Sequence, residues 1–309
     1  MEHRARKRFG QHFLHDPGVI RRILDAFDPQ PDEVIVEIGP GLGALTRPLL
    51  ERIRQLHVVE LDRDLVARLR SEYPPERLQV HAADALEFDF CALAPHMDVP
   101  VSRDDRMDAG GRATPGAVAE AGCRERPAPG TRLRLIGNLP YNISTPLLFH
   151  LLDQERCIGD MLFMLQKEVV ERMRAAPDTP DYGRLSVMIQ WRCAVEKLFD
   201  IGPGAFNPPP RVDSSIVRLT PHPTPPVAVG DPKVFADVVK AAFAHRRKTL
   251  RNNLKGIVPG AAMAALGIEP ERRAETLMLE EFARLANYAA GEQENFCRKD
   301  AKDAKKSRN

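Results

Sequence analysis

The chain has 309 residues, of which 43% are hydrophobic and 28% are charged, a composition that is ordinary for a folded globular protein. The length allows about two domains. The 45 Lys and Arg residues nearly balance the 43 Asp and Glu residues, and a net charge of +2 excludes a protein that holds nucleic acid by bulk charge alone. No apolar run approaches the ~18 residues of a membrane span, so we expect no membrane partner.

The five cysteines are widely spaced and include no CxxC pair. An odd count with this spacing predicts neither a disulfide framework nor a zinc site, so we expect no bound metal. A reducing, cytoplasmic location is consistent with this cysteine usage. The basic N-terminus, residues 1–8, lacks the apolar stretch that is typical of a signal peptide.

The first expected elements alternate between helix and strand. Asp16-Pro17 is a typical helix start, and the apolar residues of 19–27 fall on one helical face. Strands are then expected at 34–38, 56–60 and 78–81, with helices at 44–54 and 64–71. This alternation predicts a parallel sheet with helices on both faces.

Composition changes from about residue 94 to residue 131. Pro, Gly, Ala, Arg and Asp dominate there and apolar periodicity is lost, which predicts a disordered insertion. The sheet is expected to resume after it. We expect strands at 133–137, 161–165, 186–191, 195–199 and 215–219, and helices at 145–153 and 167–174.

A Pro-rich stretch, residues 221–230, is typical of a linker. Beyond it, helices are expected at 232–243, 246–254, 260–266 and 280–290. We therefore predict a first domain over 1–221, a small all-helical domain over 231–290, and a basic disordered tail over 291–309.

A glycine-rich loop and three acidic residues indicate a cofactor site. The loop 39–43 follows a strand, and its glycines let the backbone pass close to a ligand. Its G-x-G-x-G spacing does not match the G-x-G-x-x-G of dinucleotide-binding proteins. Glu37, Glu60 and Asp84 end three successive strands, and such ends converge on one crevice.

The chemistry of these acids favours one cofactor. An acid after the second strand suits a ribose diol, and an acid after the third can accept from an adenine amine. A ligand with ribose and adenine but no pyrophosphate fits S-adenosylmethionine better than a nicotinamide dinucleotide. Any one of the acids could instead be a helix cap or a surface charge, but all three together favour the cofactor.

Asn138-Leu139-Pro140-Tyr141 follows the strand expected at 133–137. Carbonyl oxygens of this stretch can accept hydrogen bonds from the amine of a flat base, and the tyrosine ring can stack on its face. A simple turn with a buried tyrosine is the alternative. Phe206, beside three prolines, is either a second stacking surface opposite Tyr141 or a core anchor.

The strongest basic cluster lies in the helical part of the chain. Arg246, Arg247 and Lys248 are consecutive, and Arg251 follows one turn later on the expected helix. Such a cluster can bind RNA phosphates. A solvated helix face explains the same residues equally well.

Several blocks of sequence match one family closely. They are 10–14, 36–41, 59–62, 137–144, 164–169, 206–215 and 245–254. They resemble the ribosomal RNA adenine dimethyltransferases from residue 6 to about residue 290, excluding the insertion, and most closely the bacterial members that act on small-subunit RNA. The resemblance implies an α/β fold, with a Rossmann-like class I methyltransferase sheet and a small all-helical domain.

The resemblance also implies an enzyme that uses S-adenosylmethionine to dimethylate two adjacent adenosines in the 3′-terminal hairpin loop of small-subunit ribosomal RNA. The substrate would be a pre-30S particle, and we expect a monomer. The implied catalytic residues are Asn138, Leu139, Pro140, Tyr141 and Phe206. The implied cofactor contacts are His12, Leu14, Gly39, Gly41, Glu60, Asp84 and Asn138.

One implied contact departs from the family pattern, because His12 stands where the family usually has asparagine. Two other functions remain open. A relative acting on large-subunit RNA would share the first domain, although Leu139 and the basic cluster favour the small-subunit enzyme. The protein could also act mainly as a ribosome-assembly checkpoint, through binding more than through catalysis.

Overall fold

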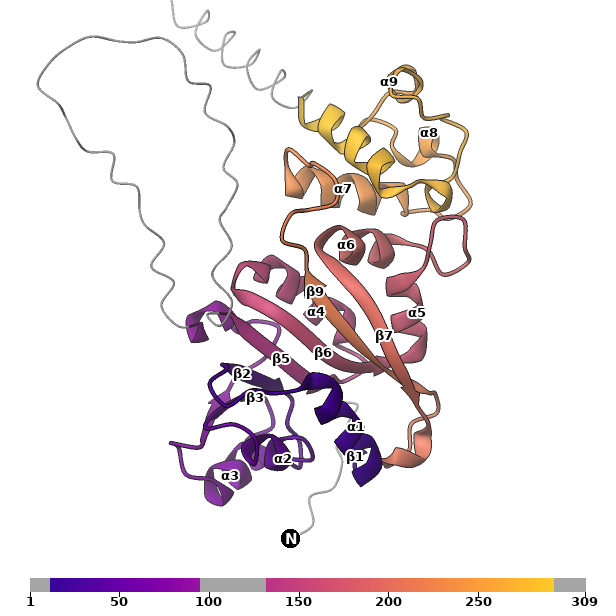
Figure 1. Cartoon of the computed structure of the whole chain (residues 1–309). Coiled ribbons are helices and arrows are strands. Elements are labelled where there is room, and N and C mark those ends of the chain that lie inside the picture. Colours follow the sequence, from indigo (N-terminus) through magenta and orange to yellow (C-terminus); the bar gives the residue numbers. More distant parts are fainter. Residues whose placement is uncertain (1–11, 95–131, 292–309) are drawn as a thin grey trace, which may run out of the picture.

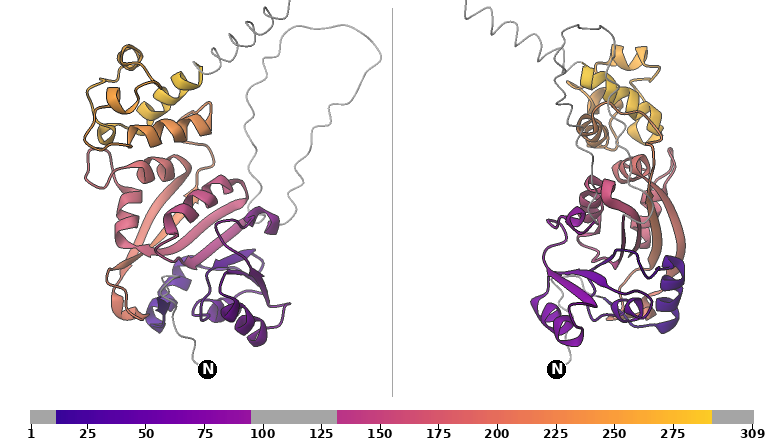
Figure 2. Two further views of the ribbon diagram at one scale, coloured as in Figure 1. Left: turned by 180° about the vertical axis from the view of Figure 1, so that it is seen from behind. Right: turned by 60° about the vertical axis from the view of Figure 1, so that its left-hand side comes forward.

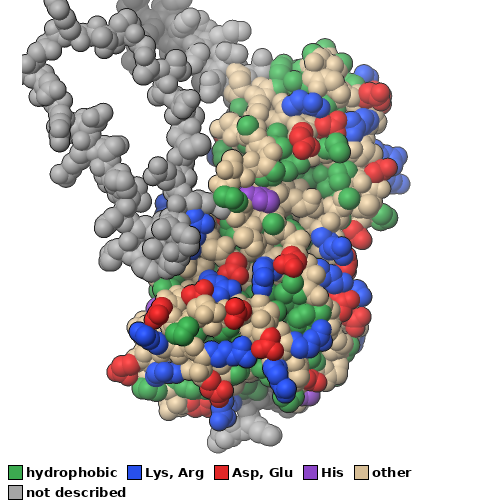
Figure 3. Space-filling view, in the orientation of Figure 1, with side chains coloured by type: hydrophobic (Ala, Val, Ile, Leu, Met, Phe, Trp, Pro, Cys, Tyr) green, Lys and Arg blue, Asp and Glu red, His purple; other side chains and the backbone are tan. Residues whose placement is uncertain are grey.

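The computed structural model describes residues 12–94 and 132–291. The expected insertion, the basic residues before His12 and the expected tail lie outside the described residues. Within the described residues, no helix is long and apolar enough to pass through a bilayer. Figure 3 shows basic and acidic side chains interspersed on the face it presents, in line with the balanced composition.

A seven-stranded sheet forms the centre of the first domain (Figure 1), with the strand order β4-β3-β2-β5-β6-β9-β7. The strands are β2 (Ile35–Ile38), β3 (Leu56–Glu60), β4 (Leu78–Ala82), β5 (Leu133–Asn138), β6 (Ile158–Gln166), β7 (Cys193–Ile201) and β9 (Ser214–Pro221). From β4 to β6 all pairings are parallel, as predicted, while β9 is antiparallel to both of its neighbours.

Two further strands form a separate ladder. β1 (Phe13–Leu14) pairs antiparallel with β8 (Phe206–Asn207), so that Leu14 lies opposite Phe206. This ladder joins the segment just before Pro17 to the proline-rich loop, although the two are far apart in the sequence.

Helices cover both faces of the sheet (Figure 2). They are α1 (Pro17–Phe27), α2 (Thr46–Leu50), α3 (Arg63–Glu72), α4 (Ser144–Asp153), α5 (Lys167–Arg174) and α6 (Arg184–Arg192). Successive residues of a strand point to opposite faces, so Leu135 of β5 enters the core shared with α4, whereas Ile136 enters the core shared with α1. Asp16 caps α1 by accepting from the Val19 amide at 2.9 Å, as its sequence predicts.

The helical part stacks against the end of the first domain near α6 (Figure 1). It consists of α7 (Pro232–Ala242), α8 (Leu250–Asn253), α9 (Gly260–Ala265) and a last helix over 279–291. Its core is continuous with α6, because Trp191 packs on Phe235 with ring centroids 4.5 Å apart.

The strand expected at 186–191 is wrong, since these residues belong to helix α6. Six of its nine residues are buried, and they divide between two cores. Leu185 and Ile189 face the sheet, while Val187 and Trp191 face the helical part. A helix buried on two sides lacks an amphipathic period, so its apolar run reads as a strand.

Two expected helices are shorter than predicted. The helix expected at 44–54 is the single turn-and-a-half of α2, because the chain turns through residues 41–45 first. The helix expected at 246–254 shrinks to α8, with the residues before it in turns. Asn253 Nδ2 donates to Ala242 O at 2.7 Å and to His245 O at 3.1 Å. The side-chain amide therefore satisfies two backbone carbonyls in this turn.

The expectation of unpaired cysteines is also wrong, because Cys91 and Cys157 form a disulfide. The two residues are 66 positions apart, and their Cα atoms lie 5.4 Å apart. Their spacing carries no signal of this pairing, since the fold brings the turn before the expected insertion beside the start of β6.

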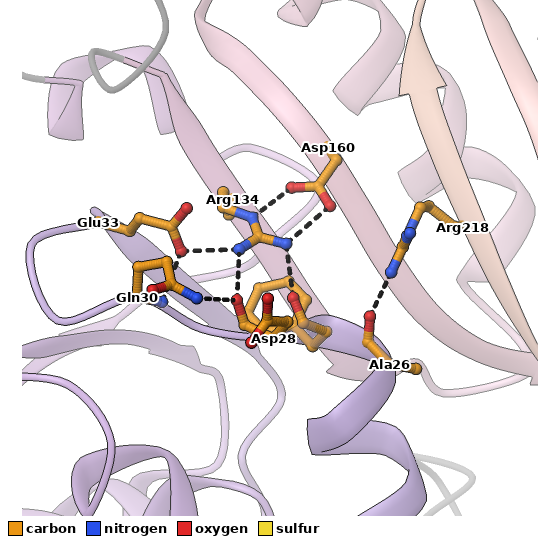
Figure 4. Close-up of polar contacts among 8 residues, drawn as sticks. Ala26, Asp28, Gln30, Glu33, Arg134, Asp160 and Arg218 are labelled. Carbon is orange, nitrogen blue, oxygen red and sulfur yellow. Dashed lines mark hydrogen bonds and ion pairs between the residues drawn. The ribbon is translucent and has the colours of Figure 1, made fainter.

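Arg134 lies at the start of β5, at the opposite end of this strand from Asn138, and binds several neighbouring groups (Figure 4). It forms two hydrogen bonds to Asp160, at 2.7 and 3.0 Å, and one to Glu33 at 2.7 Å. The guanidinium also donates to Phe27 O and Asp28 O, at 2.7 and 3.2 Å. One side chain therefore holds β5 to β6 and to the end of α1.

Candidate active site

One cavity lies at the carboxyl ends of β2, β3 and β5, where the strand order reverses. Such switch points are the usual ligand sites of open α/β sheets. Eleven of the residues that the sequence marks as a site line this cavity. They are His12, Leu14, Glu37, Gly39, Gly41, Glu60, Asp84, Asn138, Leu139, Pro140 and Tyr141.

The glycine loop closes one wall of the cavity in a conformation that requires glycine. Gly39, Gly41 and Gly43 have φ angles of 67°, 58° and 84°. A Cβ atom on Gly41 would also lie 3.1 Å from the Phe13 ring. The loop therefore packs closely against Phe13 of β1, and this contact restricts its conformation.

Glu60 is a buried carboxylate whose orientation is set by the backbone. Its Oε1 accepts from the Asp62 amide at 2.9 Å, and its Oε2 accepts from the Gly41 amide at 3.2 Å. Burial raises the pKa of Glu60, and the backbone hydrogen bonds oppose that shift. The two oxygens together have about four positions for hydrogen-bond donors, so the carboxylate can still accept from a ribose diol.

Asp84 and Glu37 complete the acidic wall. Asp84 Oδ1 accepts from the Leu86 amide at 2.9 Å, which fixes the carboxylate at the end of β4. Glu37 is almost fully buried and accepts from Thr46 Oγ1 at 2.6 Å. Burial raises the pKa of Glu37 to about 8, although the Thr46 hydrogen bond lowers it and the Glu60 charge raises it further.

The donor set fits S-adenosylmethionine. Two fixed carboxylates, Glu60 and Asp84, stand at successive strand ends, and apolar side chains such as Ile38, Leu42 and Ala85 line the space between the polar groups. A ribose, a flat adenine and a positively charged methionine part would meet acceptors, apolar surface and acidic side chains.

Asn138 ends β5 beside the acidic wall, and its amide has a fixed orientation. Asn138 Nδ2 donates to His12 O at 2.9 Å, so Oδ1 is the atom that remains to accept a hydrogen bond. The preceding residue must be glycine, because a Cβ on Gly137 would lie 2.5 Å from Ile38 O. Close approach of β2 and β5 thus places Asn138 next to the glycine loop.

Tyr141 is held through both its hydroxyl group and its ring. Its hydroxyl is 2.7 Å from Ser214 Oγ, at the start of β9, and its ring stacks on the His12 imidazole with centroids 5.6 Å apart. Burial raises the pKa of Tyr141, and the Ser214 hydrogen bond partly offsets that shift. The sequence analysis did not identify Ser214 as a site residue, because a strand serine has no signal until its cross-sheet neighbour is known.

Phe206 does not line the cavity. Its ring is 2% exposed and packs in the core under β1, with Leu14 and Ile201 among its neighbours. Of the two interpretations that the sequence allowed for Phe206, this structure shows the core anchor. Its stacking role stays a prediction that requires the ring to leave this core.

The basic cluster lies in and just before α8 of the helical part (Figure 1), and none of its residues lines the cavity. Arg246 contacts Glu275 at 3.3 Å, and Arg251 contacts Glu271 at 3.0 Å. Within the described ranges, Arg247 and Lys248 are exposed and have no ion-pair partner. These two are therefore the residues of the cluster that can bind phosphates without first losing an acidic partner.

Comparisons with known proteins agree on one family. Residues 2–291 match the model of the family described as ribosomal RNA adenine dimethylase. Two curated relatives are each called ribosomal RNA small subunit methyltransferase A. The one from Aromatoleum aromaticum is 51% identical over 94% of this chain and 96% of its own length. The one from Laribacter hongkongensis is 52% identical over 92% of this chain and 96% of its own.

Two solved structures share the fold. A dimethyladenosine transferase from Plasmodium falciparum superposes with a TM-score of 0.65 at 23% identity, covering 89% of this chain and 96% of that one. The 23S rRNA methyltransferase ErmE superposes with a TM-score of 0.58 at 24% identity, covering 89% and 98%. The predicted Rossmann-like fold with an added helical part, and the resemblance on which it rested, are confirmed.

Proposed function

Because this chain belongs to the ribosomal RNA adenine dimethylase family, we propose that Asn138-Leu139-Pro140-Tyr141 presents a target adenine to S-adenosylmethionine in the cavity beside it. The activity is the S-adenosylmethionine-dependent dimethylation of adenine in small-subunit ribosomal RNA. The target we propose is the exocyclic amines of two adjacent adenosines in the 3′-terminal hairpin loop. One observation carries the residue assignment: the Asn138 amide is anchored through its nitrogen, which leaves its oxygen to accept.

The residues prepare a poor nucleophile for attack. The bound cofactor supplies a methyl group activated by a sulfonium. The lone pair of the adenine amine is delocalised into the ring, so the amine is weakly nucleophilic in solution. Asn138 Oδ1 and the Leu139 carbonyl accept from its two N–H groups, which favours a geometry in which the lone pair is free. Orientation of this kind can lower the activation free energy by on the order of 7–11 kcal/mol.

Other groups in the site position the base and the cofactor. Tyr141 stacks on the adenine, and its ring plane is set by the bond to Ser214. Glu60 and Asp84 hold the ribose and the adenine of the cofactor. No general base is needed, since the amine becomes acidic once it carries the methyl group. The second methylation requires the base to reposition, because the monomethylated amine has one donor fewer.

The sharpest test of the assignment is Asn138→Ala. We expect methyl transfer to small-subunit particles to fall at least a hundredfold, because the amine loses its acceptor, while cofactor affinity changes by less than about tenfold. Methyl incorporation and calorimetric cofactor binding would measure the two effects separately. Asn252→Ala, which removes an exposed amide in the helical part, serves as the matched control. Near-normal turnover by the Asn138 variant would rule out the role of its amide.

The choice of RNA and the biological role are tested with the same variants. We propose that the substrate is RNA within a pre-30S particle, because the relatives of about 50% identity carry the small-subunit name. We also propose that the enzyme acts as a cytoplasmic monomer. Methyl transfer to isolated large-subunit RNA would favour the large-subunit alternative. Normal ribosome assembly in cells that carry only the Asn138 variant would favour the checkpoint alternative.

A further inference from the structure

One side-chain amide holds the turn that carries the basic cluster. The turn is closed by the Lys248 amide, which donates to His245 O at 3.0 Å. Asn253, the last residue of α8, donates from Nδ2 to the same carbonyl at 3.1 Å. It also donates to Ala242 O, at the end of α7, at 2.7 Å. The amide therefore joins the turn to the helix on either side of it.

The nitrogen of this amide makes both contacts. Asn253 Oδ1 is buried and has no hydrogen-bond partner among the described residues. Carbonyl oxygens can only accept, so neither contact survives if an oxygen replaces Nδ2. Ala242 O is one of the last carbonyls of α7, which have no partner within the helix. Basic side chains often satisfy such carbonyls, but here a neutral amide does so and no cation of the cluster is used.

The cluster contains one anchored cation and two free ones in this turn. Arg246 contacts Glu275 at 3.3 Å and donates to Pro180 O at 2.9 Å. Over residues 12–94 and 132–291, Arg247 and Lys248 are exposed and form no ion pair. The turn is thus held through the Arg246 side chain and through Asn253, while the two free cations stay exposed to solvent.

We propose that Asn253 is a positioning residue, which holds Arg247 and Lys248 in the arrangement that binds phosphates of small-subunit RNA. The inference rests on the proposed binding of RNA by this enzyme. Long-range attraction between charges needs no fixed geometry, but hydrogen bonds from a guanidinium and an ammonium to phosphate oxygens do. A turn that is already ordered presents both donors without a further loss of backbone entropy on binding.

The test is a double-mutant cycle on the full chain, with unmethylated small-subunit particles as the ligand. We expect Asn253→Ala to raise the Kd of the particles roughly three- to tenfold, and to raise KM without a matching loss in kcat. In a protein that already carries Arg247→Glu and Lys248→Glu, the same substitution should change the Kd less than about twofold, since the cations that it positions are gone. An unchanged Kd in the parent, or equal effects in the two backgrounds, would overturn the inference.

Two further variants separate the donor from the shape of the side chain and from general loosening. Asn253→Asp keeps the shape but loses the donor, so its Kd should rise at least as much as that of Asn253→Ala. Asn287 is the matched control, because its amide holds a loop of the helical part by bonds to Ala228 O at 3.0 Å and from the Gly230 amide at 2.9 Å. Asn287→Ala should leave the Kd within about twofold. A rise as large as that of Asn253→Ala would overturn the inference.

Hydrogen exchange distinguishes local loosening from unfolding of the helical part. In RNA-free Asn253→Ala, exchange should become faster over 243–249 and stay as in the parent over 232–239 of α7. Faster exchange throughout α7 would make Asn253 a structural residue and overturn the inference. If Arg247→Glu with Lys248→Glu binds particles as tightly as the parent, the inference fails as well. Methyl transfer by the Asn138 variant tests the proposed function separately.

Discussion

Hydrogen bonds from the backbone determine how the side chains of this site are oriented. Asn138, Glu60 and Asp84 each have one or two atoms fixed by main-chain groups, at distances of 2.9 to 3.2 Å. The sequence identifies these residue types and their places at strand ends. It does not show which atoms of Asn138 and Glu60 are free, because His12 O and the Gly41 amide, which fix them, come from residues distant in the chain.

A pair of histidines provides a pH test at the scale of single residues. His57 Nδ1 lies 3.2 Å from His81 Nε2, and the rings stack at 5.5 Å. Burial, with a contribution from His81, lowers the pKa of His57 to about 4 from 6.5. The folded protein therefore binds this proton only at a lower pH than the unfolded chain does. The stability that the neutral His57 contributes is fully present above pH 6.5 and is lost as the pH falls toward 4.

We expect the free energy of unfolding of the parent to fall by about 1–2 kcal/mol from this group between pH 7 and pH 4. The full pKa difference corresponds to about 3 kcal/mol, and solvent screening of a half-buried ring reduces it. Urea unfolding of His57→Gln should show a shallower decline over this range, with His245→Gln, at an exposed position, as the control. An unchanged decline in His57→Gln would contradict the shifted titration.

At the scale of elements, Arg134 links β5 to β6 and to the end of α1. It binds Asp160, Glu33 and two carbonyls at the end of α1, and its side chain is 17% exposed (Figure 4). Its removal would leave two carboxylates without their partner in a half-buried setting. The network lies at the opposite end of β5 from Asn138, so it stabilises the sheet without contacting the site.

We expect Arg134→Met to lower the free energy of unfolding by about 3–5 kcal/mol. Arg68→Met, which removes an exposed i,i+4 ion pair with Glu72, should cost about 0.5 kcal/mol or less. Urea unfolding of both variants would measure this. At a temperature where the Arg134 variant remains folded, methyl transfer should be close to normal. A cost similar to that of the Arg68 variant would show that the network contributes little.

At the scale of the whole molecule, the helical part is fixed to the methyltransferase sheet by more than a linker. Tyr182 donates to Leu277 O at 2.9 Å, Arg246 donates to Pro180 O at 2.9 Å, and the Asp178 amide donates to Glu275 O at 2.7 Å. With the core shared through α6, these contacts hold the basic cluster at a defined distance from the cavity.

Arg247 and Lys248 should therefore act as phosphate contacts remote from the chemistry. We expect Arg247→Glu with Lys248→Glu to weaken RNA binding and to reduce the slope of log K against log salt by roughly 1–2, since each phosphate contact contributes about 0.9. Lys233→Glu with Lys240→Glu changes the charge equally on α7 and is the control. Equal slopes in the two double variants would show that the cluster is a solvated surface that does not contact phosphates.

The glycine loop, the acids at strand ends and the Asn138 stretch were predictable because each is local. A glycine pattern, an acid at the end of an apolar run and a proline break depend on a few neighbouring residues. The alternation of strand and helix likewise predicted the parallel part of the sheet, and the run of expected helices after the Pro-rich stretch predicted the small helical part. The structure brings eleven of the residues that the sequence marks as a site together around one cavity.

Tertiary structure alone decided the features that depend on two distant segments. Residues 186–191 form a helix because they are buried between two cores, and Cys91 meets Cys157 because the sheet brings their turns together. In the same way, His12 lies on Tyr141 because β1 pairs with β8. Local sequence carries the chemistry of each group, whereas burial on two sides and contact across the chain arise only when the segments pack.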